Sequence, residues 1–530
     1  MSDETVRLAL PPARFRRAVR TPALMPTARL LTDGGDARIV CDANGANRYG
    51  CSPRPEPDVL AFGSATASTI SGAGFAAADA LRDQLNLFLG LEDPAVTYQR
   101  EIDRLRPELA ALCGVDDIEG LDIIFGASGT DLHLFASQFM VDRGAAAPLI
   151  VRVEAAETGR GVPDALAGRH FSDCAALGDL VVPSVPLDCG RPLEIFEISC
   201  RAADGALRPA AAIDQEVEEA VARAVAAGRR VLLTLVDVSK TGSIAPSPDC
   251  AAALRARFGD ALDVLVDACQ FRLAPATLCA YLARDFAVAI TGSKFITGPT
   301  FCGALLVPAA VARRWRTHDL PPALKSYSAR ADWPRDWAAR AALNAVPNFG
   351  LLLRWEAALS ELRAFRKLPE EDVYNFVDAF GAAILSRLES DAAFEVLPTP
   401  GLARGTFAAG ESWDQLPTIF SFLLRRPETS GRAVWLTPSE TRQVHELLRE
   451  DLRWRAEGPN AGILAPRCQL GQPVACGLRD GAPVGALRLC LSSRLIADAI
   501  SPRGRGPEAV LIDALAALDK AALLAAGPPD

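Results

Sequence analysis

The chain alternates short apolar runs with longer amphipathic segments over residues 120–310. The apolar runs are rich in Val, Ile and Leu, and they read LDIIFG, PLIVRV, RRVLLTLVDV, VLVDA and FAVAIT. Runs of this length and composition are typical of strands that are buried on both faces. Segments such as DQEVEEAVARAVAAG separate them and have the apolar spacing of a helix. This alternation predicts an α/β fold whose large domain holds a mainly parallel, doubly wound sheet.

Helices are expected on both sides of this region. Two helices should precede it and end at Gly90 and Gly114, and a long connecting helix should begin near Asn348. The rest of the chain mixes both kinds of element, with helices near 370–390 and 439–457 and strands near 417–424 and 485–492. This mixture predicts a smaller α+β domain.

Three parts are therefore predicted along the chain. Residues 1–59 are rich in Pro, Arg and Gly and are expected to form an extended N-terminal arm. At 530 residues the chain is too long for one hydrophobic core, so the remainder should divide. We expect a large domain at 60–347 and a C-terminal small domain at 348–530.

Composition argues against several functions. The formal net charge is −9, and hydrophobic and charged residues make up 50% and 23% of the chain, as in globular enzymes. An acidic balance disfavours nucleic-acid and anionic-membrane partners, because both attract a basic face. There is no apolar stretch of membrane-spanning length, and the N-terminal sequence lacks the apolar core of a secretory signal. We therefore expect a cytoplasmic protein.

Cysteine and histidine are not spaced as metal ligands. The 13 cysteines include no CxxC pair, and none of the four histidines is spaced from a cysteine or from another histidine as a ligand would be. We expect free, mostly buried thiols and no metal site.

Two charged residues stand at the ends of neighbouring apolar runs. Asp267 ends VLVDA, and Lys294 follows FAVAITGS, between Gly292 and Gly298. Because ligands of open α/β sheets bind beyond the carboxyl ends of the strands, both side chains should face one crevice. A lysine that emerges from a buried strand is poorly explained by surface solvation, and such an amine can form an imine with an aldehyde. The alternative for Asp267 is a capping or ion-paired carboxylate.

A Gly-containing turn, GASGT, joins the first of these strands to the next helix. This turn would present free backbone N–H groups at a helix N-terminus, which favours a phosphate. The residues concerned are Gly126, Ser128, Gly129 and Thr130. The simpler alternative is that the turn is only an N-cap.

With their flanking residues, these segments resemble the fold type I pyridoxal-phosphate enzymes, and within them the class V aminotransferase and cysteine desulfurase group. VDACQ is similar to the group's V-D-x-x-Q, and TGSKFITGPTFCGALLV is similar to its S-x-H-K-x-x-G-P-x-G-x-G-x-L. The separation of the two charged residues, 294 − 267 = 27, is close to that of the group. Weaker similarities at VDVSKTGSIAP, NAVPNFG and ALRLCLSS extend the resemblance over residues 60–500.

The resemblance implies a cofactor and the residues that hold it. By this resemblance Lys294 forms an imine with pyridoxal 5'-phosphate, Asp267 pairs with the pyridinium nitrogen, and Gln270 bonds the phenolic oxygen. The phosphate would be held by Gly129, Thr130, Thr291 and Ser293. The large domain would then be the PLP-binding domain, in a homodimer with its active site at the interface.

Two basic residues are candidates for binding the substrate. Arg488 lies in the apolar run LRLCL, where either a substrate carboxylate or a salt bridge with a core acid would satisfy its guanidinium. Lys240 stands where the group usually has Asn or Ser, and it either meets an acidic group of the substrate or is a solvated loop lysine. The hydroxyl-rich loop 62–75 either lines the substrate pocket or contributes only Ser71 as a helix N-cap.

The chain departs from the group at residues that select the reaction. VEAAETGRGVPDAL offers no ring to stack on the cofactor, and Thr158 is the nearest residue by spacing. Asp131 replaces a hydroxyl that often holds phosphate, so its carboxylate is expected to point away. Val346 replaces a threonine that commonly reaches the neighbouring subunit's phosphate.

The reactive thiol of the desulfurases also has no clear counterpart. Cys476 (488 − 476 = 12) and Cys468 (488 − 468 = 20) both miss the desulfurase thiol spacing of about fifteen, so packing roles are favoured.

These residues predict an enzyme that acts on an amino acid through an imine between the substrate amine and the cofactor. Lys294 would move the proton at Cα as a general base. Aminotransfer is the first expectation because it needs only these parts. A lyase that acts at Cβ, such as a cysteine desulfurase, is the alternative. A non-catalytic scaffold of the same fold is disfavoured because Lys294, Asp267 and the phosphate turn are all present.

Overall fold

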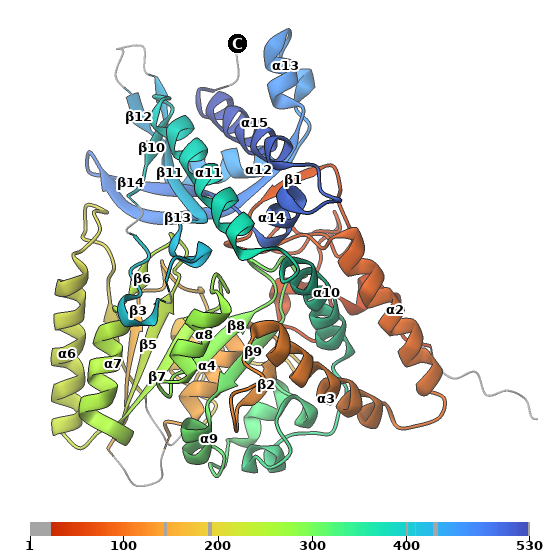
Figure 1. Ribbon diagram of the computed structural model, residues 1–530, viewed down its shortest axis with the longest axis vertical. Coiled ribbons are helices and arrows are strands. Elements are labelled where there is room, and N and C mark those ends of the chain that lie inside the picture. The colour runs from red at the N-terminus through yellow and green to blue at the C-terminus, as the bar shows by residue number, and fades with distance from the viewer. Residues whose placement is uncertain are drawn as a thin grey trace, which may run out of the picture.

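The computed structural model describes residues 23–141, 146–188, 193–398, 401–408, 410–427 and 433–527 (Figure 1). The first 22 residues of the predicted arm lie outside the described residues, and so does the segment on which the expectation of no secretory signal rests. Within the described ranges, no helix is both long and apolar enough to span a lipid bilayer.

The larger sheet occupies the lower half of Figure 1. In spatial order its strands are β2 (Asp122–Gly126), β9 (Gly303–Val307), β8 (Ala287–Thr291), β7 (Leu262–Ala268), β5 (Val231–Asp237), β3 (Leu149–Val153) and β4 (Glu194–Ile198), and the short β6 (Ile244–Ala245) pairs with β5. All pairs from β8 to β4 are parallel, whereas β9 is antiparallel to both of its neighbours. The prediction of a mainly parallel sheet is therefore confirmed. No crossover helix lies between β8 and β9, so β9 returns in the opposite direction.

The continuous apolar runs are explained by burial on both faces of this sheet. Val264 and Val266 belong to one hydrophobic cluster, whereas Leu265 between them belongs to a second cluster. Alternate residues of a strand point to opposite faces, so both faces are covered. The helices of this part are α2 (Gly72–Phe88), α3 (Pro94–Cys113), α4 (Gly129–Gln138), α5 (Val162–Leu166), α6 (Ala210–Ala226), α7 (Pro248–Phe258), α8 (Pro275–Leu282) and α9 (Ala309–Trp315).

The smaller sheet lies above the larger one in Figure 1. Its strands follow the order β1 (Val59–Phe62), β13 (Arg467–Arg479), β14 (Ala482–Cys490), β11 (Ile419–Pro427) and β10 (Phe394–Val396), and β12 (Ala433–Trp435) pairs with β11. The accompanying helices are α10 (Phe349–Phe365), α11 (Glu370–Glu389), α12 (Pro438–Leu447), α13 (Pro459–Leu464), α14 (Ser493–Ile500) and α15 (Pro507–Ala525). One expectation is corrected here, and one strand is added. The helix predicted near 439–457 ends at Leu447, and the long strand β13 was not among the predicted strands.

The N-terminal segment packs onto both parts of the molecule. The strand β1 pairs in parallel with β13, so residues 59–62 belong to the smaller sheet. Earlier in the chain, α1 (Thr27–Leu30) lies against α2 and α10. The fully buried Arg354 of α10 donates to the backbone carbonyls of Leu31, Asp33, Gly34 and Phe301. These bonds hold residues 31–34 beside the turn that follows β8.

Candidate active site

Asp267, at the C-terminal end of β7, is paired with a histidine of α4. The Oδ2 atom of Asp267 lies 3.2 Å from Nε2 of His133, and Nδ1 of His133 lies 2.7 Å from the carbonyl oxygen of Gly129. Both ring nitrogens therefore face acceptors, which requires a proton on each of them. Burial lowers the pKa of His133, but the charge and hydrogen bond of Asp267 and the Gly129 carbonyl raise it above its ordinary value. His133 is therefore a cation that faces the carboxylate.

This pairing keeps Asp267 ionised. Burial raises the pKa of the carboxyl group, but the charge and hydrogen bond of His133 and the charge of Lys294 outweigh burial, so the pKa falls well below its usual range. The backbone N–H of Cys269 donates to the same carboxylate at 3.1 Å. Sequence reasoning missed His133. The available signal was a single histidine on an apolar helix, four residues after Gly129.

Cys269 completes a buried group with His133 and Asp267 whose potential metal-ligating atoms lie within 4.8 Å of one another. Both nitrogens of His133 are already bonded to acceptors, and burial raises the pKa of the Cys269 thiol well above its ordinary value. In the arrangement described, these atoms are engaged with one another and with the backbone.

Lys294 lies in the turn after β8, where two glycines allow close packing against α10. A Cβ atom on Gly292 would lie 2.6 Å from Cβ of Ala358, and one on Gly298 would lie 2.5 Å from the same atom. The Lys294 carbonyl accepts a hydrogen bond from Ser68 at 3.1 Å. Burial lowers the pKa of the Lys294 amine, assisted by the positive charges of Arg488 and Arg272, although Cys269 and Asp267 oppose the shift.

The predicted phosphate turn is the N-terminus of α4. Ser128 is its N-cap, as the simpler alternative expected, and the first N–H groups of a helix have no partner inside it. A Cβ atom on Gly129 would lie 2.6 Å from Sγ of Cys269 and 3.4 Å from Cγ2 of Thr291, so Gly129 sits directly against the strand ends. Oγ1 of Thr291 donates to the Cys269 carbonyl at 2.7 Å, and Ser293 is buried nearby along the chain.

Asp131 does not point away as expected. Its Oδ2 atom accepts a hydrogen bond of 2.5 Å from the Ser128 hydroxyl, so the carboxyl group turns back toward the helix N-terminus. Burial, together with the charge of Asp36, raises the pKa of Asp131 to about 7. The turn therefore carries an acidic group of its own.

The loop after β1 lines this site from the other side. Nε2 of Gln270 donates to the Ala65 carbonyl at 2.9 Å, whereas the buried Oε1 has no partner among the described residues. Arg272 donates to the Ser64 hydroxyl at 2.9 Å. The loop therefore contacts the residues that follow Asp267, and Ser71 is also the N-cap of α2, accepting from Gly74 at 2.8 Å.

Arg488 is buried in β14 with a relative exposure of 1%. It donates to the carbonyl oxygens of Lys240, at 3.2 Å, and Gln472 and to the Thr66 hydroxyl at 3.0 Å. Among the described residues, its Nε atom is buried without a partner, and no acidic side chain forms an ion pair with Arg488. The alternative of a salt bridge with a core acid is therefore not found in this part of the chain. Burial also lowers the pKa of Arg488.

Lys240 is not a solvated loop lysine. Its Nζ atom donates to the carbonyl oxygens of Ala155 at 3.2 Å and Ala156 at 3.3 Å. Burial lowers the pKa of the amine to about 7, and the positive charges of Arg488 and Lys294 act in the same direction. Lys240, Lys294 and Arg488 are therefore close enough for the charges of the last two to affect the pKa of Lys240.

Within the described part of the chain, the remaining sequence candidates make no contact that assigns them a chemical role. Cys468 and Cys476 are buried in β13, with exposures of 0% and 1%, and burial raises the pKa of each thiol to about 11. They are packing residues, as expected. The Thr158 hydroxyl donates to the Glu154 carbonyl at 3.3 Å, and Val346 is 37% exposed.

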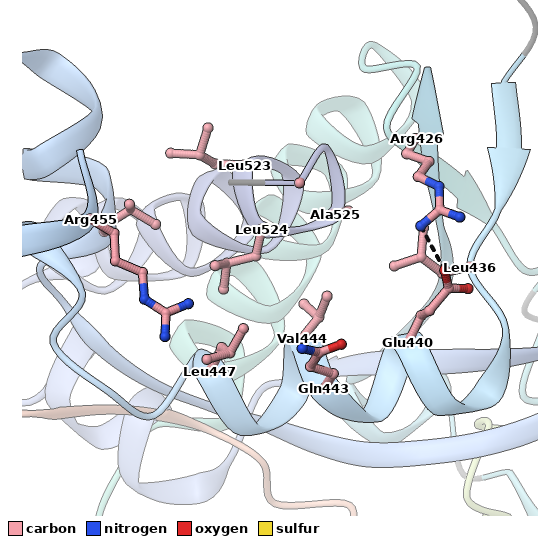
Figure 2. Close-up of a pocket in the computed structure, with 12 residues that line it drawn as sticks. Arg426, Leu436, Glu440, Gln443, Val444, Leu447, Arg455, Leu523, Leu524 and Ala525 are labelled. Atoms are coloured by element: carbon pink, nitrogen blue, oxygen red, sulfur yellow. Dashed lines mark hydrogen bonds and ion pairs between the residues drawn. The ribbon is translucent and has the colours of Figure 1, made fainter. Parts of the chain in front are cut away.

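Two cavities lie outside this group of residues. One of about 660 Å³ borders the loop after β1 and includes Ser68, Thr69 and Thr297 in its lining. The other, of about 260 Å³, lies between α12 and α15, and Figure 2 shows Leu447 and Leu524 facing it with the Arg426–Glu440 ion pair at one end. None of the predicted catalytic or cofactor-binding residues lines either cavity.

Comparison with known proteins identifies the fold. No protein-family model matches the chain, and no curated protein matches it. The cysteine desulfurase CsdA from Escherichia coli is similar with a TM-score of 0.51 and 15% identity, over 88% of this chain and 95% of that chain. The cystine C–S lyase C-DES, in complex with its reaction product cysteine persulfide, is similar with a TM-score of 0.52 and 16% identity, over 87% and 98%.

A lysine-to-alanine variant of C-DES with glycine covalently linked to the PLP cofactor gives a TM-score of 0.51 at 15% identity, over 86% of this chain and 96% of that chain. Identities this low carry the architecture alone. The chain has the fold of the fold type I pyridoxal-phosphate enzymes.

Proposed function

We propose that this protein is a pyridoxal-phosphate-dependent enzyme that acts on an α-amino acid. The observation that carries the proposal is the proximity of Lys294 to Asp267: they stand at the ends of the paired parallel strands β8 and β7, each influences the pKa of the other, and His133 is ion-paired to Asp267. Asp267 and His133 are buried and Lys294 is partly buried, and the three residues lie beside the carboxyl ends of β7 and β8. Perturbed ionisable groups that converge on one crevice are typical of catalytic sites.

The residues present fit this cofactor. The amide of Gln270 retains an unpartnered polar atom in a buried position, beside an ionised carboxylate suited to a pyridinium nitrogen. Gly129 leaves no room for a side chain between the α4 N-terminus and Cys269, which allows a ligand to approach the backbone N–H groups. The phosphate would be held at Gly129 and Thr130, with Thr291 and Ser293 close along the strand.

When bound, the cofactor supplies an aldehyde that reacts with amines and a ring that accepts electrons from Cα. The lowered pKa of Lys294 increases the fraction of neutral amine, which is the form that attacks an aldehyde and later removes a proton from Cα. Asp267 would favour a proton at the ring nitrogen, because an ionised carboxylate stabilises the protonated form. His133 keeps Asp267 in that ionised state.

Arg488 is the proposed contact for the substrate carboxylate. It is a buried guanidinium whose hydrogen bonds go to neutral oxygens, and its Nε atom is unpartnered. An unpaired buried charge is unfavourable, and a carboxylate offers the planar, bidentate match that a guanidinium prefers. Lys240 lies next to it and would meet a second acidic group of the substrate.

We favour cleavage of a bond at Cβ, as in a carbon–sulfur lyase, over aminotransfer. The two similar structures named as a cysteine desulfurase and a cystine C–S lyase support this choice. Cys468 and Cys476 are buried and protonated, so a mechanism that uses either thiol as a nucleophile is disfavoured. Sulfur would instead leave directly as a thiolate or persulfide. Aminotransfer remains the second candidate because Lys294, Asp267 and Arg488 suffice for it.

The test is to incubate the purified holoenzyme with cystine, cysteine and a panel of other amino acids. Release of sulfide or persulfide with pyruvate and ammonia would support the lyase. Conversion of the cofactor to its pyridoxamine form, restored by an α-keto acid, would support aminotransfer instead. A protein that binds the cofactor through Lys294 but changes none of these amino acids would contradict an amino-acid-converting function.

We also propose a homodimer with the active site at the subunit interface. The support is the similarity in fold and the exposed position of Val346, in the turn where related enzymes commonly reach the neighbouring phosphate.

A further inference from the structure

Arg38 reaches the N-terminus of α4 from the N-terminal segment. Its Nη1 atom lies 3.3 Å from the Thr130 hydroxyl, and its Nη2 atom lies 3.3 Å from the Ser128 hydroxyl. The side chain is 17% exposed, whereas Ser128 and Thr130 are 3% and 5% exposed. One edge of a guanidinium is thus turned toward the hydroxyls that flank the free N–H groups of the helix.

The opposite edge of Arg38 is fixed. Nε of Arg38 donates to both carboxylate oxygens of Asp36, at 2.9 and 3.0 Å, and Nη2 lies 2.5 Å from Oδ2. The guanidinium also lies over the ring of Phe301, 4.5 Å from the ring centroid. Bonds of 3.3 Å to two hydroxyls are long, so the Nη1 and Nη2 edge has donor capacity left for a stronger acceptor.

The place of Arg38 is built into the fold. Arg38 belongs to a short 3₁₀ helix, η1 (Ala37–Ile39), that is capped by Asp36. Just before it, Arg354 binds the carbonyls of Asp33 and Gly34 and also that of Phe301, on which Arg38 stacks. Protein contacts therefore hold Arg38 on both sides, through Asp36 and Phe301, and Arg38 is not simply a solvated surface arginine.

The charges around α4 explain why an arginine is required there. Asp36 and Asp131 are 2% and 1% exposed, and both lie close to the turn that would receive a phosphate. Two buried carboxyl groups beside a phosphate dianion would repel it. Arg38 places a positive charge against this turn, through its contacts with Ser128 and Thr130.

We infer that Arg38 is the guanidinium contact of the cofactor phosphate and that it gives the site its preference for a phosphorylated pyridoxal. The inference rests on the proposed function, because it takes the cofactor to be pyridoxal 5'-phosphate. The phosphate would replace the two long hydroxyl bonds at the Nη1 and Nη2 edge, while Asp36 keeps the guanidinium oriented. The N-terminal segment is then part of the cofactor site and not a separate arm.

The experiment titrates the cofactor-free full chain with pyridoxal 5'-phosphate and with pyridoxal, which has the same aldehyde and no phosphate, and follows visible absorbance. The variants are Arg38→Gln, Arg38→Lys and, as a matched control on the same segment, the exposed Arg29→Gln. For Arg38→Gln we expect the Kd of pyridoxal 5'-phosphate to rise by at least about 30-fold, as for loss of a charged hydrogen-bonded pair. The Kd of pyridoxal should change by less than about threefold, and Arg38→Lys should lie between wild type and Arg38→Gln for the phosphorylated ligand.

Inorganic phosphate provides a second measurement that does not depend on covalent binding. It should raise the thermal midpoint of the cofactor-free wild type and of Arg29→Gln, and this stabilisation should be lost in Arg38→Gln. Equal losses of affinity for pyridoxal and for its phosphate would overturn the inference, because Arg38 would then only support the fold. Unchanged affinity for the phosphorylated ligand would overturn it as well. A wild-type protein that binds neither aldehyde at Lys294 would instead contradict the proposed function.

Discussion

At the level of single residues, the ionisation of the Asp267 carboxyl group depends on its neighbour His133. His133 contacts it at 3.2 Å, and this cation holds the pKa of Asp267 well below its usual range against the effect of burial. Asp267 acts on a ring nitrogen only when it is ionised, that is, above its own pKa. Under the proposed function, His133 therefore sets part of the pH range in which Asp267 can act.

The substitution His133→Asn tests this dependence. Without the imidazolium, burial dominates, and the pKa of Asp267 should rise. As pH falls, activity should then be lost earlier, so the acid limb of the pH–activity profile should move upward by at least about one pH unit. The companion variant Asp267→Asn should lose activity about 100-fold or more at every pH, because an amide cannot hold the ring proton. An unchanged acid limb in His133→Asn would show that this cation does not control Asp267.

Lys240 offers a second test at this scale. Its pKa of about 7 means that the amine is positively charged below neutrality and becomes neutral as pH rises through 7. If it meets an acidic group of the substrate, the KM for acidic amino acids should increase above pH 7, by at most about tenfold per pH unit for one proton. Amino acids with neutral side chains serve as the control, since Lys294 and Arg488 act on both classes. In Lys240→Gln the difference between the two classes should no longer vary with pH, and a difference that persisted would place the acid contact elsewhere.

At the level of elements, the α4 N-terminus and the end of β7 are packed too closely for any side chain at position 129. The variant Gly129→Ala would bring a Cβ within 2.6 Å of Sγ of Cys269, and overpacking of this kind typically costs about 1–3 kcal/mol. We expect weaker cofactor binding and a lower thermal midpoint.

The double variant Gly129→Ala with Cys269→Ala removes the clashing sulfur and leaves the Cys269 Cβ at an ordinary 3.4 Å. It should recover most of the affinity that the single variant loses, as measured by absorbance titration. Wild-type affinity in the single variant would mean that α4 and β7 can separate without affecting the cofactor, and the account of the turn would be wrong.

The elements differ in how well sequence predicts them. Strands such as β7 and β8 are buried on both faces, so their predominantly apolar sequences are easily recognised. In contrast, β13 is interrupted by Gly471, Pro473 and Gly477 and shows mixed burial, which hides its extended conformation. The same limit applies to the site. Lys294 and Asp267 have local motifs, whereas the contact of Arg38 with the α4 N-terminus depends on long-range packing, in which Arg354, 320 positions beyond Gly34, binds that carbonyl.

At the level of the whole molecule, the site is assembled from three distant parts of the chain. The larger sheet supplies Asp267 and Lys294, the N-terminal segment supplies the loop after β1, and the smaller sheet supplies Arg488 on β14. The two sheets must therefore keep their relative positions for the substrate and cofactor contacts to coexist.

The proposed homodimer is tested by light scattering of the purified holoenzyme, which should give twice the mass of one chain. The substitution Val346→Asp would place a charge in the turn expected at the interface, and it should shift the protein toward the monomer and weaken cofactor binding. The matched control is Ile512→Asp on α15, where an exposed apolar residue is replaced outside that turn. A wild type of single-chain mass with full activity would contradict the dimer.

The most direct test of the account is the covalent attachment of the cofactor. The holoenzyme should be reduced with borohydride and digested, and the peptides should be mapped by mass spectrometry. We expect a pyridoxyl group on Lys294, and we expect Lys294→Ala to lose both the label and the visible absorbance of the bound cofactor. A pyridoxyl group on another lysine such as Lys240, with Lys294→Ala still active, would contradict the assignment on which the proposed function depends.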